Sequence, residues 1–345
     1  MTVVQARGVR SADTPFEAMT IERREPGPQD VLIDIAYAGI CHSDIEHAHS
    51  LRGPSMYPLV PGHEIAGLVR VVGAEVTRFA PGDRVGVGNM VGSCRCCDHC
   101  KAGLEQYCTG KRVLTYNSLG EDGQPTYGGY SQQIVVDERF VVRIPPGIPL
   151  QKAAPLLCAG ITLYSPLRHW RAGSGRRVAV IGLGGLGHMG VQMARAMGCQ
   201  VTVLELDPAK REDALRLGAQ DFQVAGPQVF KDLACRFDLV ISTVPARLDF
   251  EVCLGLLDLD GTLVQLAAPK EPLSIPATAL LMNRRSVAGT RSGGLAETQE
   301  MLDFCATHGI GAEVEVIHAD AIDDAYRRLE AGDVRFRFVI DNSTL

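Results

Sequence analysis

The sequence predicts a two-domain α/β protein in which a compact β-barrel is followed by a doubly wound parallel sheet. Its 345 residues exceed the size of a single ordinary core. Roughly the first 150 residues contain short β-branched runs separated by glycine and proline, which is typical of a small barrel. From about residue 173, apolar strands alternate with amphipathic helical segments, which is typical of a parallel sheet covered on both faces.

The elements of each half follow from their residue patterns. The barrel is predicted from four strand-like segments bounded by turn residues, namely VLIDIAYAG (31–39), IAGLVRVVG (65–73), PGDRVGVG (81–88) and GGYSQQIVVDERFVVRIPPG (128–147). The sheet is predicted from five apolar strands, namely RRVAVI (176–181), QVTVLEL (200–206), FDLVISTV (237–244), GTLVQLA (261–267) and SVAGT (286–290). Asp207 and Pro208 open a helix that ends at Gly218.

Composition and charge exclude several classes of protein. A hydrophobic content of 46% with 21% charged residues is ordinary for a globular chain. The formal net charge of −6 offers no basic surface for a nucleic-acid backbone. The N-terminal residues lack the apolar core of a signal peptide, and no later run reaches membrane-spanning length. We therefore expect a cytoplasmic protein that binds neither nucleic acid nor a membrane.

A glycine-rich turn joins the first strand of the second half to its helix. The turn consists of Gly182, Leu183, Gly184, Gly185, Leu186 and Gly187. Glycines in this context let the backbone approach a pyrophosphate, whose charge the following helix N-terminus favours. A purely structural tight turn is the alternative, but Glu205 at the end of the next strand has the offset of a ribose-binding acid. The pattern therefore predicts dinucleotide binding.

Glu205 also bears on the choice of cofactor. A carboxylate there accepts hydrogen bonds from ribose hydroxyls and repels a 2′-phosphate, so we expect NAD(H) to be favoured over NADP(H). Lys210, which we place in the cofactor site, and Arg211 lie close enough in sequence to soften that repulsion. The alternative is a solvated acidic residue with no role in binding.

Five cysteines crowd into GSCRCCDHCKAGLEQYC (92–108). Four of them have the spacing C-x2-C-x2-C-x7-C, namely Cys94, Cys97, Cys100 and Cys108. Because cytosolic thiols stay reduced, this spacing predicts a closed zinc site rather than disulfides. An iron–sulfur cluster and incidental cysteines are the alternatives. Cys96 does not fit the spacing, since adjacent cysteines do not easily ligate one ion, and we expect it to be a free thiol.

The remaining candidate metal ligands are scattered. Cys41 lies in GICHSDIEH (39–47), His63 in VPGHEIAG (60–67) and Cys158 in PLLCAGIT (155–162). Together they would form a Cys2His set with a fourth position open to water or substrate. Their spacing alone does not establish such a site, because each residue taken singly is more often a buried core residue.

These motifs, in this order, resemble the zinc-dependent medium-chain alcohol dehydrogenases. The cinnamyl-alcohol-dehydrogenase-like branch, which includes broad-specificity bacterial aldehyde reductases, is the most similar, also in APLLCAGITLYSPLRHW (154–170) and GDVRFRFVID (332–341). The resemblance implies a GroES-like catalytic domain (1–158 and 297–345), with the structural zinc loop at 92–108. A Rossmann NAD(P)-binding domain (159–296) is inserted between these parts. It also implies two Zn2+ ions per chain and a homodimer or homotetramer.

The resemblance further assigns individual roles. Cys41, His63 and Cys158 match the catalytic zinc ligands, and Glu64 matches a glutamate that approaches the metal. Asp44 matches a carboxylate that orients the ligating imidazole, a partner that metal-bound histidines commonly have. Ser43 matches the hydroxyl that links the alcohol to the proton path.

One motif departs from the family pattern. Relatives usually have a proton-relaying histidine where this chain has Glu46, with His47 beside it. We favour Glu46 as the relay, with His47, bulk water or a solvated glutamate without a relay role as alternatives. Arg52 replaces a large aromatic residue found in many relatives, which puts a preference for aromatic substrates in doubt.

The resemblance thus implies interconversion of primary alcohols and aldehydes, with broad-specificity aldehyde reduction expected. Zinc would polarise the small-molecule substrate, and a nicotinamide cofactor would carry the hydride. A zinc-free quinone or enone reductase on the same fold is one alternative. A non-catalytic NAD(P)-binding protein is another.

Overall fold

The computed structural model describes residues 1–246, 248–269 and 271–345 and divides the chain into two compact units. Unit 1 comprises Met1–Ile161 and Gly293–Leu345, and unit 2 comprises Thr162–Ser292. Helix α4 (Ala159–His169) contains the first boundary. These units are defined by how compactly their residues pack. The predicted boundaries 158/159 and 296/297 divide the chain by catalytic and cofactor-binding role, and they stay a prediction.

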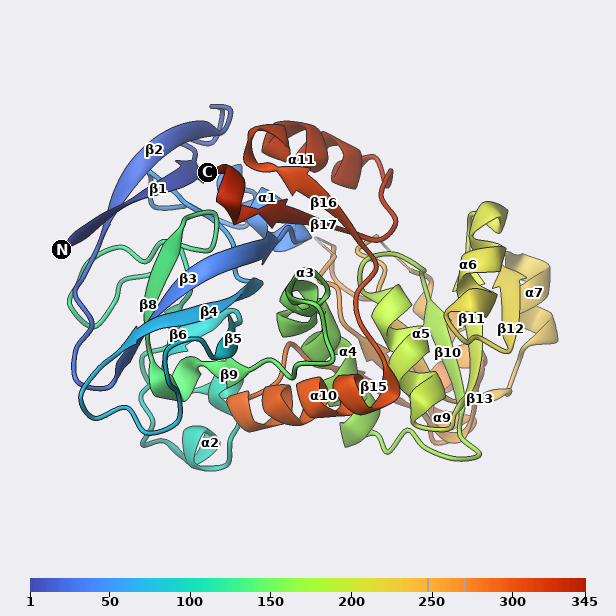
Figure 1. The fold of residues 1–345 in the computed structure, drawn as a ribbon. Coiled ribbons are helices and arrows are strands. Elements are labelled where there is room, and N and C mark those ends of the chain that lie inside the picture. The colour runs from blue at the N-terminus through green and yellow to red at the C-terminus, as the bar shows by residue number, and fades with distance from the viewer. Residues whose placement is uncertain (247, 270) are drawn as a thin grey trace. The chain divides into compact units, whose positions relative to one another are not determined.

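Unit 1 is built on a seven-stranded, mostly antiparallel sheet in the order β16-β17-β3-β4-β5-β9, with β8 also paired to β3 (Figure 1). Two two-stranded antiparallel sheets, the β1–β2 hairpin and the pair β6–β7, complete its strands. The strands are β1 (Thr2–Gly8), β2 (Glu17–Arg23), β3 (Asp30–Gly39), β4 (Ile65–Val72), β5 (Arg84–Val87), β6 (Met90–Gly92), β7 (Val113–Leu114), β8 (Gln133–Asp137), β9 (Val142–Arg143), β16 (Val314–His318) and β17 (Arg337–Asp341). Apolar residues recur along β3, β4 and β8 and form one buried cluster that includes Ile33, Ile65 and Ile134.

Helices and 3-10 turns connect the strands of unit 1. The α-helices are α1 (His42–Ala48), α2 (Asp98–Lys101), α3 (Leu150–Ala153), α10 (Leu295–His308) and α11 (Ile322–Glu330). The 3-10 turns are η1 (Glu105–Tyr107), η2 (Glu138–Phe140), η3 (Ala154–Leu157), η5 (Ala319–Ala321) and η6 (Asn342–Thr344). A second apolar cluster, which includes Ile40, Ile45, Tyr130 and Tyr326, packs α1 and α11 together.

Unit 2 is a six-stranded parallel sheet in the order β12-β11-β10-β13-β14-β15. Its strands are β10 (Arg177–Ile181), β11 (Gln200–Glu205), β12 (Asp221–Val224), β13 (Phe237–Ser242), β14 (Leu257–Gln265) and β15 (Ser286–Gly289). Its helices are η4 (Pro208–Lys210), α5 (Gly187–Ala196), α6 (Arg211–Arg216), α7 (Pro227–Asp232), α8 (Phe250–Gly255) and α9 (Ala277–Leu281). The strand order reverses between β10 and β13, which is the ligand-binding position of a doubly wound sheet. The predicted fold class is therefore confirmed.

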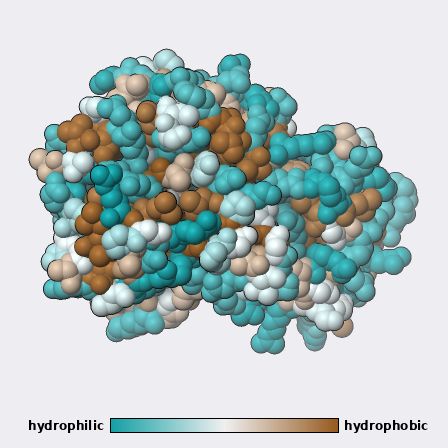
Figure 2. Space-filling model, viewed as in Figure 1, coloured by the Kyte–Doolittle hydropathy of each residue, from teal (hydrophilic) through white to brown (hydrophobic). Residues whose placement is uncertain are grey.

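The mixture of hydrophilic and apolar residues at the surface agrees with a content of 46% hydrophobic and 21% charged residues. On the face shown in Figure 2, hydrophilic residues surround separate groups of apolar residues. Within the described ranges, no helix is both long and apolar enough to cross a membrane.

Candidate metal centres and cofactor site

Four predicted ligands for a catalytic metal come together in unit 1 although they are far apart in sequence. Cys41, His63, Glu64 and Cys158 each place one ligand atom within 4.8 Å of the others. Cys41 follows β3, the pair His63–Glu64 immediately precedes β4, and Cys158 follows η3. Because β3 and β4 run antiparallel, the end of one strand lies beside the start of the other.

The geometry and chemistry of this group fit zinc. The Sγ atoms of Cys41 and Cys158 are 3.8 Å apart, and Nε2 of His63 is 3.2 Å from Sγ of Cys158. Two thiolates on one tetrahedral zinc, each at about 2.3 Å, are separated by about 3.8 Å. Oε2 of Glu64 is buried without a hydrogen-bond partner in the described residues, so it is available to a cation.

Asp44 fixes the orientation of His63. In the capping box that opens α1, the backbone N–H of Cys41 donates to Asp44 Oδ2 at 2.8 Å. His63 Nδ1 lies 3.0 Å from Asp44 Oδ1, so its N–H donates to the carboxylate and Nε2 faces the thiols. Burial opposes a charge on His63, but Asp44 and Cys41 outweigh it and raise the pKa of the imidazole well above its usual value.

Glu64 has a partner that the sequence motifs did not indicate. Arg337 on β17 forms an ion pair with Glu64 Oε1, and both side chains are buried. A side chain at Gly39 would overlap Glu64, so the end of β3 is shaped around this carboxylate. The signal that was missed is Arg337 between Phe336 and Phe338 at the start of an apolar strand, since a guanidinium buried there has to be paired or hydrogen-bonded.

The predicted proton-path residues lie near the same group but have local partners. Ser43 is half-buried, with Oγ 3.9 Å from Cys41 Sγ. Glu46 forms an ion pair with Arg52 at 2.6 Å. His47 Nδ1 lies 3.0 Å from the side-chain amide of Asn117. The relay role of Glu46 stays a prediction.

The four cysteines of the 92–108 loop form a second group. Cys94, Cys97, Cys100 and Cys108 place their sulfurs within 4.8 Å of one another, whereas Cys96 is exposed and outside the group. Backbone N–H groups lower the pKa of the Cys94 and Cys97 thiols, the latter to about 5, whereas burial raises the pKa of the Cys100 thiol to about 12. A closed set of four cysteine sulfurs is the ligand set of a structural zinc site.

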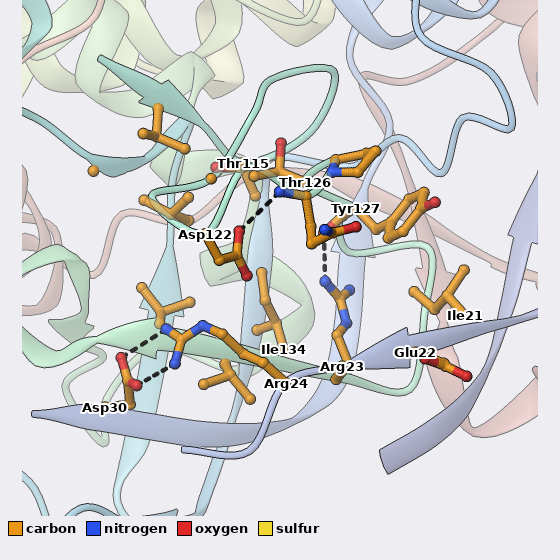
Figure 3. A pocket seen from close by; sticks show the side chains of 18 of the residues that line it. Ile21, Glu22, Arg23, Arg24, Asp30, Thr115, Asp122, Thr126, Tyr127 and Ile134 are labelled. Carbon is orange, nitrogen blue, oxygen red and sulfur yellow. Dashed lines mark hydrogen bonds and ion pairs between the residues drawn. The ribbon is translucent and has the colours of Figure 1, made fainter. Parts of the chain in front are cut away.

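A separate cavity of about 1460 Å³ lies in unit 1 beside the β1–β2 hairpin (Figure 3). Two arginines of its lining already have partners, since Arg24 pairs with Asp30 and Arg23 donates to the carbonyl of Tyr127 (Figure 3). Its lining contains none of the predicted ligands among the described residues. The Cys41–His63 group therefore lies outside this cavity.

The glycine turn of unit 2 has the shape of a phosphate cradle. Gly182 has a φ of 90°, which favours glycine, and a side chain at Gly187 would overlap the carbonyl of Gly182. The space beside Gly184 is open for 4 Å. This turn leads into α5, a ten-residue helix whose N-terminus favours an anion. The residues therefore fit a dinucleotide.

Glu205 lies at this turn, but its carboxylate is occupied. Oε2 accepts the Leu183 N–H at 2.7 Å and contacts Lys210 Nζ at 3.1 Å, while Oε1 accepts the Leu206 N–H at 2.7 Å. Burial raises the pKa of Glu205, but these donors outweigh it and hold the pKa below its usual value.

Comparisons with known proteins agree with this arrangement. Residues 27–146 match the alcohol dehydrogenase GroES-like domain, and residues 185–307 match the zinc-binding dehydrogenase family. The chain is 58% identical to NADP-dependent alcohol dehydrogenase C of Mycobacterium bovis over the full length of both. Among solved structures, a cinnamyl alcohol dehydrogenase of Sorghum bicolor has a TM-score of 0.95 at 43% identity, covering 99% of this chain and 98% of that one. The CAD of Helicobacter pylori, complexed with NADP(H), has a TM-score of 0.93 at 43% identity, with the same coverage.

The predicted preference for NAD(H) is wrong. The Mycobacterium relative is named NADP-dependent, and the Helicobacter structure holds NADP(H). The physical reason lies in Glu205, whose carboxylate binds the Leu183 and Leu206 backbone and Lys210 instead of remaining free for ribose hydroxyls. The prediction allowed for Lys210 and Arg211 beside Glu205 but not for the two backbone N–H groups that its carboxylate accepts.

Proposed function

Because the chain belongs to the zinc-dependent medium-chain alcohol dehydrogenases, we propose that it interconverts primary alcohols and aldehydes with NADP(H). We place it in the cinnamyl-alcohol-dehydrogenase-like branch. Broad-specificity aldehyde reduction is the proposed direction. The observation that carries the proposal is the convergence of Cys41, His63 and Cys158 from three distant segments.

The residues of unit 1 define what the site does. Cys41, His63 and Cys158 would hold the catalytic zinc, with Glu64 available as a further oxygen ligand. Zinc supplies Lewis-acid polarisation of a carbonyl or a lowered pKa of an alcohol. Asp44 accepts the His63 Nδ1–H, so that Nε2 is the nitrogen left to face the metal, which would take the place of its proton. The Ser43 hydroxyl can accept one proton while donating another, which suits the end of a proton path.

The residues of unit 2 would hold the cofactor. The turn 182–187 offers backbone N–H groups and a helix N-terminus to the pyrophosphate. The nicotinamide supplies or accepts the hydride. Lys210 offers a cation near the place of the adenosine ribose, which suits a 2′-phosphate.

Metal content and a substrate panel test the proposal. We expect two zinc ions per chain by elemental analysis and reduction of aliphatic, terpenoid and aromatic aldehydes with NADPH. A zinc-free quinone or enone reductase, or a non-catalytic NAD(P)-binding protein, would retain one ion in the 92–108 loop and reduce no aldehyde. The assembled Cys41–His63–Cys158 group favours the dehydrogenase over both alternatives.

A homodimer or homotetramer is part of the proposal. Strand β15 is at one end of the described six-stranded order, so one of its edges is open to a second copy. Leu281 and Met282, on and just after α9, are 76% and 77% exposed. The molar mass, measured by light scattering as the protein elutes from a size-exclusion column, tests the oligomeric state. A monomer at micromolar concentration would contradict the proposal. A cytoplasmic location, also proposed, suits thiolate sites that need reduced cysteines.

A further inference from the structure

The Asp44 carboxylate is fully buried and therefore depends on its hydrogen-bond donors. Oδ1 accepts from His63 Nδ1 at 3.0 Å and from the Gly62 N–H at 3.2 Å. Oδ2 accepts from the Cys41 N–H at 2.8 Å and from the Tyr130 hydroxyl at 3.4 Å. Three of these donors belong to the segments that carry the metal ligands, whereas Tyr130 comes from a separate segment just before β8. The buried hydroxyl of Tyr116 also interacts with Asp44.

Tyr130 is itself linked to Tyr326 on helix α11. Their hydroxyl oxygens are 3.3 Å apart. A tyrosine hydroxyl has one hydrogen, and that of Tyr130 points to Asp44, so Tyr326 has to donate to Tyr130. The result is a chain of donors, from Tyr326 through Tyr130 to Asp44, that ends on the negative charge.

Packing holds both rings in place without using the hydroxyls. Tyr130 and Tyr326 belong to an apolar cluster and are 0% and 3% exposed. Phe16 packs against both, with ring centroids 6.0 Å and 5.1 Å away. Phenylalanine would fill the same space, and burying a hydroxyl is costly unless it is bonded. What the two tyrosines add over phenylalanine is therefore the pair of hydrogen bonds that leads from Tyr326 through Tyr130 to Asp44.

The hydroxyls remain donors over the ordinary pH range. Burial, and then the charge of Asp44, raise the pKa of both tyrosines well above the usual value.

We propose that Tyr130, supported by Tyr326, is a positioning residue for the catalytic zinc site: it fixes the Asp44 carboxylate that in turn orients His63. The inference rests on the proposed function, because it assumes that His63 ligates zinc. When the Tyr130 hydroxyl is removed, Asp44 keeps its charge but gains freedom to turn away from His63. Zinc at this site is then held less tightly, while the 92–108 loop is unaffected.

The test uses the full-length zinc-loaded enzyme with Tyr130→Phe, Tyr326→Phe and both together. Tyr57→Phe is the matched control, because its hydroxyl donates to the Ala48 carbonyl and has no bond to Asp44. Zinc release to a chromogenic chelator, the melting temperature, kcat and KM are measured for each protein. In Tyr130→Phe, one of the two ions should leave roughly tenfold faster, which is the low end for an outer partner of a metal ligand. The second ion should leave at the unmutated rate.

The order of the donors, from Tyr326 through Tyr130 to Asp44, also predicts how the effects of the variants compare. Tyr326→Phe should have a smaller effect, and the double variant should not exceed Tyr130→Phe, because Tyr326 acts only through Tyr130. Unchanged zinc release in Tyr130→Phe with a lower melting temperature would show a merely structural role and overturn the inference. So would an equal acceleration in Tyr57→Phe. If Tyr130→Phe fails to fold, Tyr326→Phe decides, and zinc release at the unmutated rate there counts against the inference. An unmutated enzyme with one zinc per chain would instead refute the proposed function.

Discussion

Asp44 Oδ1 lies 3.0 Å from His63 Nδ1, and both side chains are buried. This contact determines which imidazole nitrogen is left for the metal. Asp44→Asn should lower the zinc affinity of this site roughly 10–100-fold, because a neutral amide orients the ring poorly. Competition with a chelator of known affinity measures the change. Asp34→Asn, a partly exposed acid of the same unit, is the control, and equal affinities in the two variants would contradict the role of Asp44.

Removal of a ligand should have a sharper effect. His63→Ala should reduce bound zinc from two ions per chain toward one and abolish turnover. NADPH binding, measured by quenching of protein fluorescence, should survive, because the turn 182–187 belongs to the other unit. Near-normal turnover in His63→Ala would remove zinc from the mechanism.

The sequence predicts well wherever the partners are close along the chain. The sulfurs of the 92–108 loop and the turn before α5 are set by local spacing. The strand-like segment 128–147 contains two strands, because Asp137 caps the turn η2, which separates β8 from β9. Apart from those that the family resemblance assigned, partners that meet only through the fold escaped prediction. Glu64 and Arg337 are 273 residues apart, and Asp44 and Tyr130 are 86 apart. Glu205 was misread for the same reason, since its partner Leu183 belongs to the neighbouring strand's turn.

The choice of four cysteines in the 92–108 loop is testable by two neighbouring substitutions. Cys97→Ser should lower the melting temperature and release one zinc, because an ion with three thiolates is held less tightly. Cys96→Ser should change neither quantity, because that thiol is exposed and outside the group. Differential scanning calorimetry and elemental analysis measure both. Equal damage from the two substitutions would mean that a different set of four binds the ion.

The buried Glu64–Arg337 pair should be costly to break on one side only. Arg337→Met should reduce the free energy of unfolding by about 3–5 kcal/mol, since it leaves a carboxylate buried without its cation. Adding Glu64→Gln should restore part of the loss, because the remaining group is then neutral. Chemical denaturation of the single and double variants measures the difference. A double variant less stable than Arg337→Met would show that Glu64 is stabilised by something other than this arginine.

Lys210 Nζ lies 3.1 Å from Glu205 Oε2 and is partly exposed, so it can offer its charge to a phosphate. Glu205 in turn holds the glycine turn through the Leu183 N–H. A hydrogen bond to a charged group contributes about 1.5–3 kcal/mol. Lys210→Ala should therefore raise the KM for NADPH by about tenfold or more and change the KM for NADH much less, since only NADPH has a 2′-phosphate. Glu205→Ala should instead weaken both cofactors, because the Leu183 N–H loses its acceptor and the turn loosens. Lys231→Ala, an exposed lysine on α7, controls for a general loss of positive charge. If Lys210→Ala left the NADPH to NADH ratio of kcat/KM unchanged, the cation that selects the phosphate would have to be another residue.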